Sequence, residues 1–250
     1  MPQVGTPRRP RVAGRLIRVG VAVSLIAVSV AAPAPVGAAN ERFEMDLGAR
    51  SDFVPQTNFV QCVGASMQMM LNMMSAKDDR TATTQLRLQQ LARQESGPPR
   101  PGGRERQGAS VRGWAKGLNL EGAGPYHLVG TTTIDEALLT AARAMRTTGK
   151  PVGLLMWRGR HAWVMSGFRA TGDPLVPGTR VTGIYVEDPL YPYGSSVWGP
   201  SPAPGEYLTV AELARQYVPR RHSTRFGSAL SGKYVLVLPY NIPLKRLRQI

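Results

Sequence analysis

The chain has 250 residues and a formal net charge of +15, with 27 glycines, 21 prolines and 42% hydrophobic residues. This composition provides enough apolar material for one sizeable core and indicates a loop-rich globular protein rather than a collagenous, coiled-coil or multi-span membrane protein. A single cysteine excludes an intramolecular disulfide framework and any multi-cysteine zinc or iron–sulfur site.

The first 39 residues have the pattern of a secretory signal peptide. An arginine-rich start precedes an apolar run from Val19 to Ala32, and the small residues 37–39 form a cleavage site. The run is shorter than the roughly 20 apolar residues that span a bilayer, and Pro33 interrupts it. We therefore predict a secreted, extracellular protein whose mature chain begins at Asn40. A membrane anchor formed by an uncleaved N-terminal helix is the alternative.

Residues 40–250 are expected to form a single domain with its core over about residues 53–238. The glycine- and proline-rich stretch at residues 97–108 indicates a surface loop, and residues 241–250 form a basic tail. Side-chain pockets for a substrate are expected to come from loops such as Tyr191–Ala203, whose course the sequence does not determine.

The first half of the domain is predicted to be helical. The segment Cys62–Met74 is apolar on nearly all sides, which indicates a buried helix, and its methionine cluster is expected to pack in the core. More polar helices are expected over about Thr81–Gln94 and Ser110–Leu118. A capping-box spacing from Thr133 to Glu136 begins a further helix that ends near Thr147.

The second half is predicted to be mostly strands. The expected strands are Val152–Trp157, Ala162–Phe168, Val181–Glu187 and Tyr234–Leu238, with Gly159-Arg160 as the turn between the first two. A second capping box, from Thr209 to Glu212, begins a helix that reaches about Tyr217. Helices that come first and strands that follow are typical of an α+β fold with an antiparallel sheet.

The positive charge does not by itself predict a nucleic-acid partner. The basic clusters around Arg220-Arg221-His222 and in the tail are not interleaved with aromatic residues, as a single-strand binding groove would be. We expect a solvated charged face, or contact with an anionic cell surface, and no nucleic acid. We also expect a monomer without a cofactor or metal, with His127 and His222 at the surface.

Four residues have the chemistry of a thiol acyl-transfer site. Cys62 begins a predicted helix, where free amides and the macrodipole favour the thiolate. Gln56 could donate a hydrogen bond to an oxyanion. His161 lies at the entry to a strand and could act as base, and Asp188 ends the next strand, where it could orient the imidazole. Each has a structural reading too: Cys62 as a core residue, Asp188 before proline as the start of a turn, and Gln56 as a solvated loop side chain.

These segments resemble the papain-like cysteine peptidase superfamily and, within it, the bacterial peptidase C39-like proteins. The similarity lies in Val54-Pro55-Gln56 with the Cys62 segment, in Gly159-Arg160-His161-Ala162-Trp163-Val164, and in Val186-Glu187-Asp188-Pro189. It implies a helical subdomain led by the cysteine helix and packed on an antiparallel sheet that carries His161 and Asp188. By this resemblance Cys62 is the nucleophile, His161 the general base and acid, Asp188 the orienting group, and Gln56 with the Cys62 amide the oxyanion hole.

The resemblance predicts a secreted cysteine peptidase that cleaves peptide or protein substrates through a thioester. Val63 departs from the Gly or Trp that more often follows the cysteine, and this puts the shape of the cleft beside it in doubt. Amidase and acyl-transferase activity stay open as related chemistry. The alternative from another class is a non-catalytic papain-like binding module that attaches to anionic wall or partner surfaces.

Overall fold

The computed structural model describes residues 42–97, 107–222 and 229–240, all of which belong to one compact unit. The predicted signal peptide, the start at Asn40 and the basic tail lie outside the described residues, as does most of the predicted loop at 97–108. Within the described ranges, no helix is both long and apolar enough to cross a bilayer.

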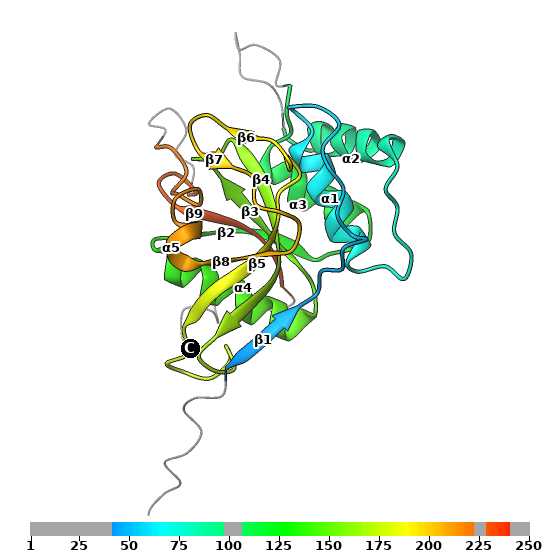
Figure 1. Cartoon of the computed structure of the whole chain (residues 1–250). Helices are drawn as coiled ribbons and strands as arrows, with labels where there is room; N and C mark the ends of the chain where they lie inside the picture. Colours follow the sequence, from blue (N-terminus) through cyan, green and yellow to red (C-terminus); the bar gives the residue numbers. More distant parts are fainter. Residues whose placement is uncertain (1–41, 98–106, 223–228, 241–250) are drawn as a thin grey trace, which may run out of the picture. The chain divides into compact units, whose positions relative to one another are not determined.

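An antiparallel sheet forms the centre of the unit (Figure 1). Its strands pair in the order β2-β9-β3-β4-β5-β8, and β1 also pairs with β4. Strand β4 is long enough to pair with two short strands in succession. Its first half pairs with β3 and its second half pairs with β1. The bounds are β1 Phe43–Asp46, β2 Tyr126–Thr131, β3 Val152–Met156, β4 His161–Ala170, β5 Val181–Glu187, β8 Glu206–Thr209 and β9 Tyr234–Pro239; β6 (Gly194–Ser195) and β7 (Gly199–Pro200) form a separate small hairpin.

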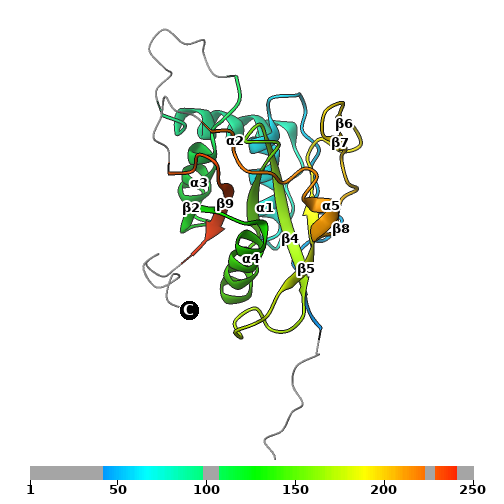
Figure 2. The same ribbon diagram turned by 90° about the vertical axis from the view of Figure 1, so that its left-hand side faces the viewer.

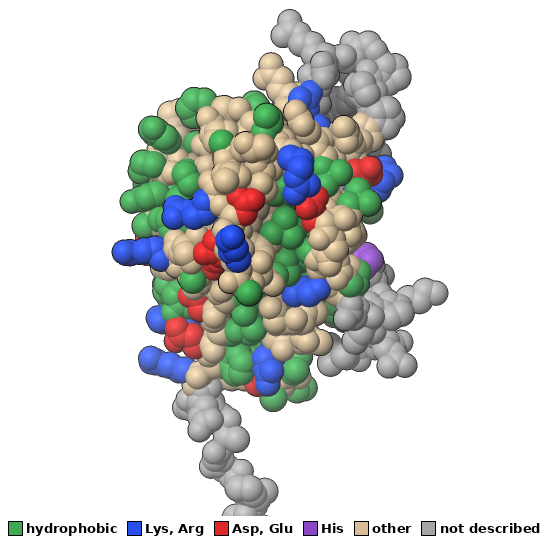
Figure 3. All heavy atoms as spheres, turned by 90° about the vertical axis from the view of Figure 1, so that its right-hand side faces the viewer, with side chains coloured by type: hydrophobic (Ala, Val, Ile, Leu, Met, Phe, Trp, Pro, Cys, Tyr) green, Lys and Arg blue, Asp and Glu red, His purple; other side chains and the backbone are tan. Residues whose placement is uncertain are grey.

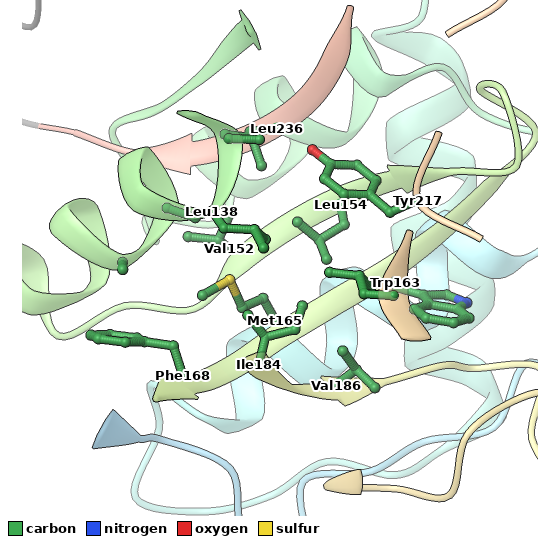
Figure 4. Packing of buried hydrophobic residues seen from close by; sticks show 14 of the residues in the cluster. Leu138, Val152, Leu154, Trp163, Met165, Phe168, Ile184, Val186, Tyr217 and Leu236 are labelled. Carbon is green, nitrogen blue, oxygen red and sulfur yellow. The ribbon is translucent and has the colours of Figure 1, made fainter. Parts of the chain in front are cut away.

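Helices cover both faces of this sheet because its strands carry apolar side chains on both. Alternate residues of β3 and β4 divide between two clusters: Leu155, Ala162 and Val164 pack with α1–α3, whereas Leu154, Trp163 and Met165 pack with α4 (Figure 4). Figure 2 shows α4 to the left of β4 and β5, and Figure 1 shows α1 and α2 grouped on the right of the sheet. The helix bounds are α1 Cys62–Asn72, α2 Ala82–Gln94, α3 Val111–Leu120, α4 Ile134–Thr148 and α5 Val210–Leu213.

Helices α2, α3 and α4 each begin one residue after a hydroxyl side chain, of which only Thr133 was predicted as a cap. Thr81, Ser110 and Thr133 each accept a hydrogen bond from a backbone amide in the first turn of α2, α3 and α4. The reciprocal half of the first predicted capping box is wrong, because Glu136 accepts from Thr132 instead of Thr133. The second box, Thr209 with Glu212, is confirmed, although α5 ends at Leu213 rather than near Tyr217.

Two glycines allow α1–α3 to pack closely. A Cβ atom on Gly113 of α3 would lie 1.9 Å from the carbonyl oxygen of Ala92 in α2. One on Gly64 of α1 would lie 2.7 Å from the carbonyl oxygen of Gln85. Both obstacles are backbone atoms, so a side chain at either position would separate the helices. The position of Cys62, two residues before Gly64, therefore depends on this close contact.

The general class, helices packed on an antiparallel sheet, is confirmed, but the predicted separation of helices from strands is wrong. Strand β1 precedes all described helices, and β2 lies between α3 and α4 and pairs with β9. These strands and β8 were not predicted. Strands β1 and β8 are short and mix polar with apolar residues, so their sequences lack a clear strand pattern. On the face shown in Figure 3, basic side chains are interspersed with acidic ones rather than gathered into one patch.

Candidate active site

Cys62 is the first residue of α1, as predicted, and its side chain reaches a hollow of about 240 Å³. His161 lines the same hollow, together with residues of α3 and the segment before it, the β3–β4 turn and its flanking strands, Val63, and Arg220. The thiol is half-buried, which leaves it accessible. Cys62 also packs against the core cluster of α1–α3, so its side chain borders both the core and the hollow.

His161 and Asp188 meet at one end of the sheet. His161 begins β4 and Asp188 directly follows β5, which is the antiparallel neighbour of β4. The imidazole Nε2 lies 2.6 Å from Asp188 Oδ1, and both side chains are buried. Asp188 Oδ1 also accepts a hydrogen bond of 2.9 Å from the Leu190 amide, which fixes the carboxylate. With Nε2 engaged, the other ring nitrogen, Nδ1, remains for the thiol.

The pKa of His161 is raised to about 9. Burial is the largest single influence and lowers the pKa, but hydrogen bonds to Asp188 and to the Cys62 side chain together outweigh it. The imidazole therefore stays protonated at neutral pH. The protonated ring lies between the Asp188 carboxylate and the Cys62 side chain.

The ring of Trp157 stacks on the imidazole of His161, with ring centroids 4.1 Å apart and an interplanar angle of 23°. Trp157 lies in the β3–β4 turn, which spans residues 157–160 and is longer than the predicted Gly159-Arg160 turn. Its φ of 54° is rare for a bulky residue. The indole Nε1 donates to Gln216 Oε1 at 2.9 Å, and the Trp157 amide donates to the Gln216 carbonyl. Trp157 thus holds one face of the ring in place and excludes water from it.

Replacing Trp157 by leucine is expected to slow alkylation of Cys62 by iodoacetamide by roughly 10-fold or more, because small misplacements of reacting groups have large kinetic costs. Trp157→Phe keeps a ring against His161 and is expected to retain most of the rate. The two variants separate positioning of the imidazole from a general loss of packing, which thermal unfolding measures independently. An unchanged rate in a folded Trp157→Leu protein would contradict this role.

Gln56 is placed beside Asp188 rather than in the Cys62 hollow. Its backbone amide donates to the Pro189 carbonyl at 2.7 Å, and its side-chain Nε2 donates to the Asn58 carbonyl at 2.8 Å. The side-chain oxygen is buried and has no partner among the described residues. An amide group carries two hydrogens, so one N–H remains for an oxyanion. The structure brings Cys62, His161 and Asp188 together, whereas Gln56 is bonded to the segment that follows Asp188 and lines a different hollow.

Two buried glutamines of α2 support the segment before Cys62, and sequence reasoning missed both. Gln85 accepts from the Thr57 amide at 2.8 Å and donates to the Pro55 carbonyl at 2.9 Å. Gln89 accepts from the Gly64 amide and donates to the Val60 carbonyl, both at 2.9 Å. Gln89 thereby satisfies one of the free amides at the start of α1. The only signal in the sequence is their four-residue spacing, which places both on one face of α2.

A buried carboxyl group, Glu187, directly precedes Asp188 and was also missed. Burial, the largest cause, raises its pKa to about 8, and repulsion from Asp46 and Asp52 adds to the effect. Its Oε2 has no hydrogen-bond partner in the described part of the chain. Glu187 is therefore largely protonated at neutral pH, beside a carboxylate that is engaged with His161.

The remaining candidates have structural places. His127 and His222 are exposed, as predicted, and Met67, Met69 and Met70 are fully buried in the cluster of α1–α3. Among the residues that the structure describes, no group of three or more His, Cys, Asp or Glu side chains is placed to hold a metal ion. In comparisons with known proteins, the chain matches no family model and no curated protein.

Proposed function

We propose that the protein is a secreted cysteine peptidase with a papain-like fold. The observation that carries this proposal is the arrangement of Cys62 at a helix start, His161 in the same hollow, and Asp188 at 2.6 Å from His161 Nε2. A nucleophile, a base and an orienting carboxylate in this order are the parts of a thiol acyl-transfer site. The proposal includes secretion. Recovery of the intact chain only from membranes would contradict that part of it.

The chemistry uses two steps. The Cys62 sulfur attacks the carbonyl carbon of a peptide bond, and His161 transfers its proton to the leaving amine as the C–N bond breaks, which leaves a thioester. His161, now neutral, takes a proton from a water molecule whose oxygen attacks the thioester; the C–S bond breaks, the carboxylic acid product leaves, and the Cys62 sulfur is released as the thiolate beside the imidazolium. Asp188 stabilises the imidazolium in its orientation throughout. The Cys62 amide and the Gln56 side chain would supply hydrogen bonds to the oxyanion.

Because the chain has one cysteine, covalent capture tests the proposal at a single site. A peptide carrying a chloromethyl ketone is expected to form one adduct, located at Cys62 by mass spectrometry, and wild-type protein is expected to cleave members of a peptide library. Cys62→Ala should lose both properties, and His161→Ala should slow capture strongly.

Fast capture without any cleavage of peptides would shift the assignment to an amidase or acyl transferase. Slow capture that is insensitive to His161→Ala, in a protein that unfolds cooperatively, would overturn the enzyme and favour a binding module on the same fold. The alanine variants of Cys62 and His161 remove small or buried side chains, so circular dichroism and thermal unfolding are needed to show that each remains folded.

A further inference from the structure

A second hollow, of about 440 Å³, lies beside the candidate active site. One wall is the segment Pro55–Phe59, which ends three residues before Cys62, and the other is Pro189–Tyr193, which directly follows Asp188. Gln56 is part of the first wall, and its amide joins the two walls through the Pro189 carbonyl. The hollow is thus built from the chain segments that carry the nucleophile and the orienting carboxylate.

The two walls present large apolar side chains to solvent. Phe59 is 83% exposed and Tyr193 is 70% exposed, and one comes from each wall. The described lining of this hollow contains proline, aromatic, aliphatic, amide and hydroxyl side chains and no charged one. A single exposed apolar residue is common on protein surfaces, whereas two that face one uncharged hollow are a candidate for apolar binding.

The walls are held in place before any ligand binds. Gln85 bonds to the backbone of both Pro55 and Thr57, and the ring of Tyr191 packs edge-on against Phe53 with centroids 6.2 Å apart. On the second wall, the Tyr193 carbonyl accepts from the Ser201 amide at 3.0 Å. A preformed hollow loses little conformational freedom when a ligand enters it, so it can discriminate between ligands by shape and polarity.

We propose that this hollow binds a bulky apolar side chain of the substrate, aromatic or long aliphatic, close to the bond that Cys62 attacks. The inference rests on the proposed peptidase function and names its substrate class: polypeptides with such a residue beside the cleaved bond. A hollow between Phe59 and Tyr193 favours an apolar over a charged side chain because it offers apolar contact and no counter-charge among its described residues.

The test uses a double variant that combines Phe59→Ser and Tyr193→Ser. It is compared with wild type and with a control double variant that combines Leu175→Ser and Val176→Ser. The control pair is also exposed, at 47% and 55%, but lies in the β4–β5 loop outside the hollow. Wild type is expected to cleave library peptides with Phe, Leu or Tyr next to the scissile bond roughly 10- to 200-fold more efficiently than peptides with Ala there. The double variant should lose this preference, the control should keep it, and both should retain the wild-type rate of Cys62 alkylation.

Binding separates this inference from the proposed function. Fluorescence anisotropy with the Cys62→Ala protein measures the affinity of fluorescein-labelled library peptides without any chemistry. If wild type cleaves peptides with no apolar preference, or if the double variant keeps that preference, the inference is wrong and the peptidase stands. If Cys62→Ala binds apolar peptides through Phe59 and Tyr193 but wild type cleaves none, the hollow is a binding site and the peptidase proposal fails. If peptides neither bind nor are cleaved, both are wrong.

Discussion

Asp188→Asn is expected to lower peptide turnover by roughly 10²–10⁴-fold while the protein stays folded. Asparagine keeps the shape of the side chain but removes the charge that holds His161 as an imidazolium. Burial is the largest influence on His161 and opposes protonation, so without the carboxylate its pKa should fall from about 9 toward or below the ordinary value near 6.5. Alkylation of Cys62 at pH 7 should slow in parallel, because less imidazolium is then present.

Proton NMR measures this change directly, since the chain has three histidines and the two outside the site, His127 and His222, are exposed and serve as references in the same sample. Asp173→Asn is the matched control: Asp173 forms a surface ion pair with Arg146 at 3.2 Å, and such pairs contribute little. Full turnover in Asp188→Asn, with the His161 titration unmoved, would show that Asp188 does not orient the imidazole.

The elements that the sequence predicted well are those whose signal is local. Thr81, Ser110 and Thr133 are side chains that cap helices through bonds within three residues, so their helices start where expected. The apolar runs of β3 and β4 are buried on both faces and are continuous in the sequence. The placement of Cys62, His161 and Asp188 at element ends was predictable for the same reason, since each borders one of these recognisable segments.

The parts that the sequence did not predict depend on contacts between distant segments. Strand β2 exists because it pairs with β9, more than 100 residues later in the chain. Gln85 and Gln89 look like ordinary polar helix residues until the fold brings the Cys62 segment against them. Trp157 belongs to a turn whose unusual backbone conformation no residue type signals. In each case the residue type alone does not indicate the structural role, which depends on a contact with a distant part of the chain.

Glu187 illustrates the same limit on one strand. Alternation along β5 places Ile184 and Val186 on one face, which predicts that Glu187 points to solvent on the other. The opposite face is covered too, so Glu187 is buried, and repulsion from Asp46 and Asp52 adds to the effect of burial on its pKa. This environment favours the neutral, protonated form of the carboxyl group.

The free energy of unfolding is therefore expected to fall as the pH rises from about 5 to 9, and Glu187→Gln should flatten this dependence. The pKa of Glu187 is about 8 in the folded protein, above the ordinary value of 4.5, so the folded state holds this proton more tightly than the unfolded state does. Its contribution to stability is present below about pH 4.5 and is lost as the pH rises through about 8. His161 acts in the same direction, with its contribution lost through about pH 9.

One group that is protonated only in the folded state changes the stability by about 1.4 kcal/mol per pH unit. Urea unfolding at several pH values measures this slope. Glutamine is neutral at every pH, so the unfolding free energy of Glu187→Gln should match that of wild type near pH 5 and exceed it by about 2 kcal/mol or more at pH 8.5. The variant should keep only the shallower pH dependence that comes from His161. Glu95→Gln, which removes only a surface ion pair with Lys116, should keep the wild-type slope. Equal slopes in wild type and Glu187→Gln would mean that Glu187 is ionised in the folded protein. Glu187 would then be a buried carboxylate beside Asp188 rather than a neutral carboxyl group.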